Sequence, residues 1–205
     1  YRLSEALMAV YKLFWDEFSS WYLEIIKPAY GEGIPSSIHD CTLRFFDNLL
    51  HLLHPFMPFI TEEIYCTLLP EEDSIMISQW PVYTEERSFP EAEKAVEGFK
   101  EAVRGIRNTR TEMNVPVNRK TSLYIVGRDA DTCARYEACK RSFVNLAFSK
   151  EIQVQETKEG IGEDAVSVVV SDAVVYLPLE DLVDIAKEIE RLEKEEKRLT
   201  GELAR

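Results

Sequence analysis

The sequence predicts a mainly α-helical protein with three regions: a helical bundle, a small α+β subdomain and the first helix of a coiled-coil arm. Up to residue 69, apolar residues recur at helical spacing and prolines interrupt them. Strand-like alternation begins only after residue 120. From residue 180, an apolar residue recurs every seven positions among charged ones. We therefore expect a bundle with its connector at 1–89, the α+β subdomain at 90–179 and the arm at 180–205.

Three helices are expected in the bundle. Apolar residues from Leu3 to Ile26 cover well over half of a wheel drawn at about 100° per residue, as in a helix with neighbours on two sides. The stretch YGEGIPSS breaks this helix, and Ser37 with Asp40 resembles a capping box opening a second helix that ends near residue 53. Pro58 suits the first turn of a third helix through residue 68. A turn-rich connector with one apolar island, IMISQWPVY, follows.

The next region mixes helices and strands. A helix from about Glu91 to Met113 places Val96, Phe99, Val103 and Ile106 on one face. TSLYIVG and EIQVQ alternate like strands, and DTCARYEACKRSFVNLAF between them is helical in pattern. VSVVV and AVVYLPL form a hairpin around two turn residues. We expect a sheet of about three strands.

The last region is nearly all charged apart from one narrow seam. Its heptad positions are Leu182, Ile185, Ile189, Leu192 and Leu199, interrupted by Glu196. A single helix cannot bury such a seam, so we expect a second helix as partner. The wide apolar face of the first helix also lacks an obvious cover. We expect the chain to be a fragment of a longer protein.

Composition limits the function. The 205 residues are 45% hydrophobic, which is typical of a globular protein, and their formal net charge of −13 is strongly acidic. Because phosphate binding needs clustered Lys and Arg, any nucleic-acid binding must be local. No apolar run approaches the roughly 18 residues of a membrane span, and the first residues lack the charged-then-apolar layout of a signal peptide. We therefore expect a cytoplasmic protein with no membrane partner.

Chemistry-bearing motifs are few. The cysteines Cys41, Cys66, Cys133 and Cys139 form no CxxC pair, and we expect small buried or half-buried thiols. His51 and His54 lie one helical turn apart without a further ligand at metal spacing, so no metal site is expected. No P-loop or GxGxxG motif is present, and we assign no catalytic residues.

Five segments in order resemble one family. They are LFWDEFSSWYLEIIKP, LHPFMPFITEEIY, Trp80 with Pro81, IRNTRTEMNVP and LPLEDLVDIAKEIERLEKE. Together they resemble the C-terminal part of bacterial valyl-tRNA synthetases, which are class I aminoacyl-tRNA synthetases. The resemblance implies an anticodon-binding bundle lacking its opening helix, a small α/β subdomain, and half of an antiparallel coiled-coil arm that leans on the tRNA elbow.

The same resemblance implies the activity of the parent protein. The parent would be a monomeric ligase that attaches valine to its tRNA with ATP, and it would edit misactivated threonine. ATP and Mg²⁺ would bind the parent's catalytic domain, because the HIGH and KMSKS signatures are missing here and no cofactor is expected in this chain. The implied partners are the tRNA for valine and the catalytic and editing domains of the same chain.

Two alternatives stay open. The equivalent region of isoleucyl-tRNA synthetase shares the bundle and the HPFxPF-type segment, although such enzymes usually end in a cysteine zinc module that is absent here. A helical scaffold or adaptor that binds proteins through its coiled coil would also show unpaired apolar faces. Binding of the tRNA for valine would separate these alternatives from the first interpretation.

Candidate RNA contacts in the bundle are side chains near a polar surface and a glycine-containing loop. Bases unstack onto aromatic side chains or arginine planes, and Lys12, Trp15, Tyr30 and Arg44 have suitable groups. Trp15 is the exception, because its place within the broad apolar face favours the core. Glycines permit close approach of a ligand to backbone, so the loop from Gly31 to Ser37, including Gly33, is the stronger candidate.

The remaining candidates lie on the 91–113 helix and on the arm. Arg104 points outward in a surface ion pair, whereas Arg107 beside Lys100 marks an edge that can hold a phosphate. Arg110 falls on the apolar face in line with Phe99 and Val103. It is either buried against a carboxylate or carbonyls, joining the bundle to the α/β unit, or turned toward a groove at the helix end. On the arm, Lys194 and Arg198 are candidate phosphate contacts.

Overall fold

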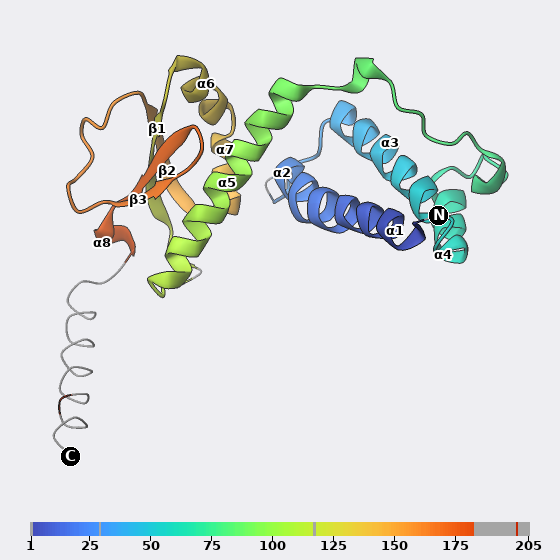
Figure 1. The fold of residues 1–205 in the computed structure, drawn as a ribbon, viewed down its shortest axis with the longest axis horizontal. Coiled ribbons are helices and arrows are strands. Elements are labelled where there is room, and N and C mark those ends of the chain that lie inside the picture. Colours follow the sequence, from blue (N-terminus) through green and yellow to red (C-terminus); the bar gives the residue numbers. More distant parts are fainter. Residues whose placement is uncertain (1, 29, 117, 183–199, 201–205) are drawn as a thin grey trace. The chain divides into compact units, whose positions relative to one another are not determined.

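The computed structural model describes residues 2–28, 30–116, 118–182 and 200. The chain divides into two compact units, Tyr1–Ser88 and Phe89–Arg205, and each is treated by itself (Figure 1). The predicted coiled-coil arm lies outside the described residues, apart from its first residues and Thr200. Within the described residues, no helix is long and apolar enough to cross a membrane.

The first unit begins with one continuous helical run, as predicted for residues 3–26. It consists of α1 (Leu3–Lys12), the π-helix η1 (Leu13–Tyr22) and α2 (Leu23–Ile26). In a π-helix each N–H bonds to the carbonyl five residues back, so the turn is wider than in an α-helix. The hydroxyls of Ser19 and Ser20 donate to carbonyls five residues earlier, those of Phe14 and Trp15, at 2.9 and 2.8 Å. The two serines therefore support the wide turns.

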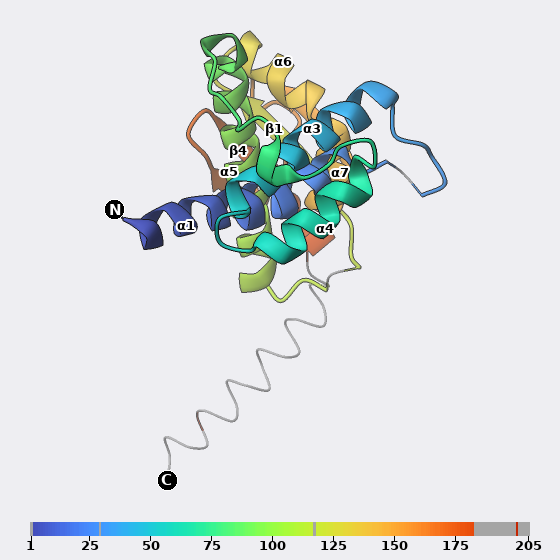
Figure 2. The ribbon, with the colours of Figure 1, turned by 90° about the vertical axis from the view of Figure 1, so that its right-hand side faces the viewer.

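Two further helices complete the bundle (Figures 1 and 2): α3 (Ser36–Leu53) and α4 (Pro58–Leu68). Pro58 occupies the first turn of α4, as predicted. The predicted capping box of Ser37 and Asp40 is wrong, because the N-cap residue of α3 is Pro35, two residues before Ser37, and no side chain caps the helix. Instead the carbonyl of Pro35 accepts the N–H groups of Ile38 and His39.

Aromatic rings join η1 to α3. Phe18 stacks on Phe46 with ring centroids 5.9 Å apart, and Tyr22 meets Phe45 edge-on at 5.6 Å. The Tyr22 hydroxyl also lies 2.9 Å from the hydroxyl of Thr42. A second core joins α3, α4 and the connector through buried Leu50, Tyr65 and Ile75.

The two histidines tie the connector to the helices. The buried ring of His51 contacts the Asp47 carbonyl through Nδ1 at 2.9 Å and the Ser78 hydroxyl through Nε2 at 2.6 Å. The Nδ1 of His54 lies 2.7 Å from the Thr61 hydroxyl. Both rings thus have structural partners, and the described residues hold no cluster of three or more metal-ligand side chains. The connector otherwise contains only the short 3₁₀ turns η2 (Ile75–Ile77) and η3 (Glu85–Arg87).

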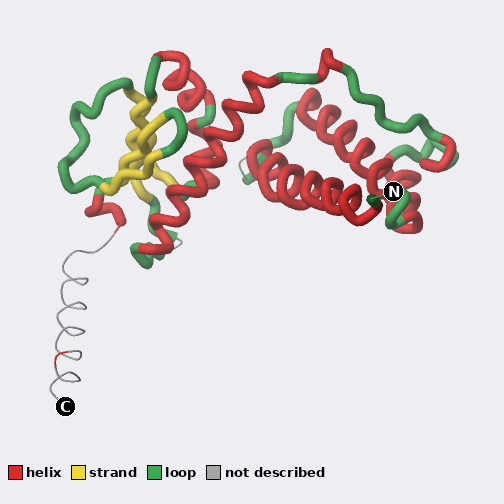
Figure 3. Tube along the Cα trace, in the orientation of Figure 1, coloured by secondary structure: helices red, strands yellow, loops and turns green. Residues whose placement is uncertain are grey.

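The second unit is a two-layer α+β fold (Figure 3). Its sheet has the order β2-β1-β4-β3 and contains β1 (Thr121–Gly127), β2 (Ser149–Gln155), β3 (Val166–Val169) and β4 (Ala173–Leu177). β1 and β2 are parallel and are connected through α6 (Ala130–Ala138) and α7 (Lys140–Leu146), whereas the other pairs are antiparallel. The described sheet thus has four strands rather than three, and the single helix predicted before β2 is two helices.

Helix α5 (Pro90–Glu112) packs with α7 against the sheet. Residues alternate between buried and half-buried along β1 and β4, so one face of the sheet carries the core. Phe99 of α5 meets Phe143 of α7 edge-on, with centroids 4.6 Å apart. Gly105 lets α5 approach β3 closely, since a Cβ at this position would lie 2.4 Å from a methyl of Val168. Of the four residues predicted to share one face of this helix, Phe99, Val103 and Ile106 are buried and Val96 is 43% exposed.

Residues 110–115 end α5 with a Schellman motif. Asn114 adopts the left-handed conformation with φ of 53°, which asparagine tolerates better than most residues. Its N–H donates to the Thr111 carbonyl at 3.0 Å, and the N–H of Val115 donates to the Arg110 carbonyl at 2.8 Å. The next residue, Pro116, cannot continue a helix. The sequence MNVP therefore stops α5 and turns the chain back toward β1.

Candidate nucleic-acid interface

The exposed face of α1 and η1 presents an aromatic and cationic surface. Trp15 is 56% exposed and Tyr11 51% exposed, so the expectation that Trp15 lies in the core is wrong. Lys12, also exposed, is the last residue of α1 and lies on the same helical run as Trp15. An exposed ring beside an ammonium group can stack on a base and pair with its phosphate.

The loop between α2 and α3 is the second exposed surface. The side chain of Tyr30 is fully exposed, and Gly31 follows with φ of +85°, a conformation that favours glycine. A Cβ at Gly31 or Gly33 would meet no atom within 4 Å, so backbone is open to a ligand at both positions. The loop leads into the first turn of α3, where backbone N–H groups and the helix dipole favour anions.

Arg44 lies elsewhere in the bundle. It lines a hollow of about 210 Å³ between α3 and α4, together with the acidic Asp40 and Asp47 and the aromatic Tyr65. Lys12 lies two residues before Phe14, whose ring packs toward Phe46, and therefore projects away from α3. The structure does not bring Arg44 and Lys12 together. The two carboxylates also make the hollow unfavourable for a phosphate.

In the second unit, Arg104 and Arg107 are exposed on the C-terminal half of α5. The Nε–H of Arg107 donates to the Leu146 carbonyl at 2.9 Å, at the end of α7. The negative end of the α7 dipole favours a cation at this point. Arg107 is thus held at the surface, and its contact with RNA stays a prediction.

Lys100 and Arg110 require correction, because both side chains are buried. Lys100 is 1% exposed and forms an ion pair with Glu97 one turn earlier. Arg110 is 5% exposed. Neither side chain can reach a phosphate in the folded unit, so neither belongs to the candidate interface.

Arg110 holds together the segments that follow its own helix. One guanidinium nitrogen, Nη2, donates to the carbonyls of Pro116 and Arg119 at 3.1 and 2.7 Å. Nη1 lies 3.4 Å from the Thr121 hydroxyl, and the guanidinium carbon lies 5.7 Å from the ring centre of Phe148. Burial lowers the pKa of Arg110. The predicted burial against carbonyls is confirmed, but the joined segments are α5, the loop after it and β1 rather than the bundle.

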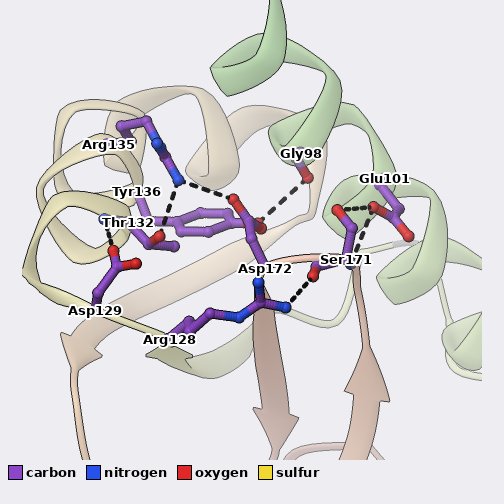
Figure 4. A network of polar contacts seen from close by, with 9 residues as sticks. All are labelled: Gly98, Glu101, Arg128, Asp129, Thr132, Arg135, Tyr136, Ser171 and Asp172. Carbon is purple, nitrogen blue, oxygen red and sulfur yellow. Dashed lines mark hydrogen bonds and ion pairs between the residues drawn. The ribbon is translucent and has the colours of Figure 1, made fainter. Parts of the chain in front are cut away.

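A polar network fixes the turn between β3 and β4 (Figure 4). The carboxylate of Asp172 accepts the Tyr136 hydroxyl at 2.8 Å and a guanidinium N–H of Arg135 at 3.1 Å. The Glu101 carboxylate accepts the N–H and the hydroxyl of Ser171 at 3.1 and 2.7 Å. Burial, and then the hydrogen bond and charge of Asp172, raise the pKa of Tyr136 well above its ordinary value. The network ties α5 and α6 to one end of the sheet and is structural.

The predicted arm contacts, Lys194 and Arg198, lie outside the described residues. The chain enters the arm through α8 (Leu179–Leu182), which packs against the start of β1. Among the described residues, sequence reasoning misplaced the Trp15 indole, which is exposed, and the Lys100 ammonium group, which is buried. In the sequence, only Ser19 and Ser20, five residues after Phe14 and Trp15, indicate the wider turns of η1. A helical wheel with a constant number of residues per turn cannot represent such turns.

The chain has a helical bundle with exposed aromatic and basic side chains, followed by an α+β unit. These features are typical of a class of proteins in which helical modules bind RNA. Comparison with known families gives the particular one. Residues 1–125 match the family described as the anticodon-binding domain of tRNA ligase, and the chain belongs to this family.

Individual relatives match along the entire chain. The valine–tRNA ligase of Clostridium acetobutylicum is 39% identical over 208 aligned positions, covering 100% of this chain and 24% of the relative. That of Bacteroides thetaiotaomicron is 43% identical, covering 98% and 22%. That of Bacillus subtilis is 37% identical, covering 100% and 24%. The chain thus spans about a quarter of the length of these relatives.

Proposed function

We propose that the chain is the tRNA-binding C-terminal region of a valine–tRNA ligase. The observation that carries this proposal is the similarity of 37 to 43% identity to valine–tRNA ligases along essentially the whole chain. The parent would attach valine to its tRNA with ATP and Mg²⁺ bound in a separate catalytic domain. It would act as a cytoplasmic monomer, and the chain described here would recognise the tRNA for valine without catalysing a reaction itself.

In this proposal the bundle binds the anticodon. The Trp15 ring and the Tyr30 ring offer stacking surfaces, while Lys12 and the backbone at Gly31 and Gly33 offer groups for phosphates and base edges. Arg107 of α5 would contact a phosphate farther along the RNA. Because these contacts are local on an acidic chain, affinity should come from a few cations and decrease with salt by a small slope.

A binding titration tests the proposal. The chain is titrated with the tRNA for valine and with the same tRNA carrying an altered anticodon, at several salt concentrations. We expect tighter binding to the unaltered tRNA and weakening of both complexes as salt increases. Equal affinity for the two tRNAs, or no binding in a longer chain that includes the neighbouring domain, would contradict the proposed function.

Arg107→Ala tests the phosphate contact. We expect weaker binding to both tRNAs and a logarithmic salt slope that is smaller by about one, because one phosphate contact is lost. Arg87→Ala is the matched control, since it removes the same charge from an exposed position in the connector. The assignment of Arg107 fails if both variants change the slope equally.

A further inference from the structure

Phe148, the second residue after α7, combines an unfavourable backbone conformation with an exposed ring. Its φ of 53° lies in the left-handed region, where a bulky side chain is disfavoured. The residue directly follows Ala147, the C-cap of α7. Glycine is the usual residue at this position, because it adopts the left-handed conformation without steric cost. The backbone of Phe148 therefore costs the fold free energy that glycine would not cost.

The ring of Phe148 is held in place but is only partly covered. The guanidinium carbon of the buried Arg110 lies 5.7 Å from the ring centre, within the range of a cation–π contact. The Phe148 carbonyl accepts the N–H of Thr121 at 3.2 Å, which attaches the residue to the start of β1. Phe148 nevertheless remains 37% exposed. A ring that is already held at the surface loses little conformational entropy when a ligand packs on it.

Two exposed cationic side chains lie close to this ring. The Nε–H of Arg107 donates to the carbonyl of Leu146, two residues before Phe148. Lys120 is exposed and directly precedes Thr121, whose N–H bonds to Phe148. The ring therefore lies between a guanidinium group from α5 and an ammonium group from the start of β1.

The acidic residues of β2 and α8 do not cancel these cations. Asp181 forms an ion pair with Lys150 at 2.6 Å, so the charges of these two residues offset each other. Glu151 is exposed and carries one negative charge against the two positive charges of Arg107 and Lys120. A flat apolar ring beside an excess of positive charge matches a nucleotide, which presents a flat base and an anionic phosphate.

We propose that Phe148 stacks on an unpaired base of RNA while Arg107 and Lys120 bind the adjoining phosphates. The inference deepens the proposed function and rests on it for the identity of the RNA, the tRNA for valine. The base is an unpaired one, because bases within a duplex are stacked on each other and cannot reach a side chain. The unfavourable backbone then has a purpose, since it keeps an aromatic ring at the surface where glycine would offer none.

Phe148→Gly separates this role from a structural one. Glycine relieves the strain of the left-handed conformation, which offsets the lost contact with Arg110, so the Tm of the second unit should stay unchanged. The Kd for the tRNA should rise about tenfold, because stacking of one base is lost. A lower Tm with an unchanged Kd would show that the ring serves the fold and would overturn the site. An unchanged Kd with an unchanged Tm would leave the ring to a protein partner and would overturn it equally.

Two further variants decide the matter if Phe148→Gly also loses stability. Phe148→Leu keeps an apolar side chain but removes the ring, and it should raise the Kd as glycine does. Phe148→Tyr keeps the ring and should bind as the parent does. Phe89→Leu is the matched control, because Phe89 is 67% exposed at the N-cap of α5, and it should leave the Kd unchanged. Parent-like binding by Phe148→Leu, or equal losses in the two leucine variants, would refute the stacking.

The salt dependence of binding distinguishes the ring from the cations. Phe148→Leu removes no charge, so it should weaken binding by the same factor at every salt concentration. Lys120→Ala should instead reduce the logarithmic salt slope by about one, as expected for Arg107→Ala. A salt slope that Lys120→Ala leaves unchanged would remove Lys120 from the site.

A short RNA tests the site independently of the proposed function. The complete chain is titrated with single-stranded oligoadenylate and with a duplex RNA of the same length, and the ring protons of Phe148 are followed by NMR, assigned by comparison with Phe148→Leu. A base stacked on the ring should shift these signals upfield with the single strand and not with the duplex. No shift with the single strand would overturn the site. A preserved shift in a chain that fails to bind the tRNA for valine would refute the proposed function and leave the site standing.

Discussion

Replacing Arg110 by alanine should destabilise the second unit while the first remains intact. The guanidinium is 5% exposed and bridges the carbonyls of Pro116 and Arg119. Alanine removes both hydrogen bonds and leaves two carbonyl oxygens facing the space that the side chain occupied. The loop between α5 and β1 then loses the group that holds its two ends together.

The magnitude follows from these contacts. A hydrogen bond with a charged partner contributes about 1.5–3 kcal/mol, so two such bonds set an upper limit near 6 kcal/mol. Burying the charged guanidinium costs free energy, and this desolvation also lowers the pKa of Arg110. The alanine variant no longer has this cost, which offsets part of the loss. Water can also enter and satisfy part of the carbonyls. We therefore expect a net loss of about 2–3 kcal/mol, or roughly 10–20 °C in Tm for a unit of this size.

The distribution of tryptophan makes the assay specific. Trp15, Trp21 and Trp80, the three tryptophans of the chain, all lie in the first unit. Tryptophan fluorescence should therefore keep its unfolding midpoint in Arg110→Ala, whereas calorimetry should show a lower Tm for a second transition. Arg110→Lys keeps the charge but cannot reach both carbonyls, so its Tm should lie between those of the parent and the alanine variant.

The control is Arg107→Ala, which removes the hydrogen bond to the Leu146 carbonyl from an exposed position on the same helix. Its Tm should fall by only a few degrees. Equal losses in Arg107→Ala and Arg110→Ala would refute the buried-bridge interpretation. A fall in the fluorescence midpoint would instead refute the independence of the two units.

Three further predictions concern packing, RNA stacking and pH. Gly105→Ala should destabilise the second unit by about 1–3 kcal/mol in chemical denaturation, because its Cβ would lie 2.4 Å from Val168. This overpacking outweighs the gain in helix propensity. Equal stability of the variant and the parent would show that β3 can move away from α5. Trp15→Ala should weaken tRNA binding by about 1–3 kcal/mol with little change in the free energy of unfolding. Trp21→Ala, at a buried position, should instead lower the free energy of unfolding by about 3–5 kcal/mol. The reverse pattern would place Trp15 in the core. The pKa of Tyr136 is raised in the folded unit, so the contribution of Tyr136 to stability is complete below the ordinary tyrosine pKa of about 10 and is lost as pH rises further. Tyr136→Phe should therefore flatten the decline of Tm at alkaline pH. Parallel declines of Tm in the variant and the parent would contradict this.

Sequence periodicity predicted the elements well where one face of an element is buried. Thr121–Gly127 alternates between buried and half-buried positions, and the strand predicted there has the same bounds. The wheel also placed Arg110 in line with Phe99 and Val103, and all three are buried. The acceptors of Arg110 could not be predicted, because backbone carbonyls carry no side-chain signal.

Other features depend on geometry that a regular pattern does not contain. Trp15 is exposed together with Leu7, Met8 and Tyr11 of the regular helix α1, and a helical wheel shows where an apolar face lies but not whether another element covers it. Lys100 fell on the flank of the wheel but is buried, since its stem packs beneath the ion pair with Glu97. The ion pair between Lys150 and Asp181 joins residues 31 apart in the sequence, at a point where the pairing of β1 with β2 shifts its register. No local sequence motif predicts it.

The connector between the two units has a practical consequence. From Gln79 to Phe89 every side chain is exposed except the half-buried Pro81. Proteases prefer exposed segments with little regular structure, and Arg87, at the end of the short turn η3, offers trypsin a cleavage site within this one. Brief digestion should therefore release the bundle and the α+β unit as separate products, and each can then be purified and titrated with RNA by itself.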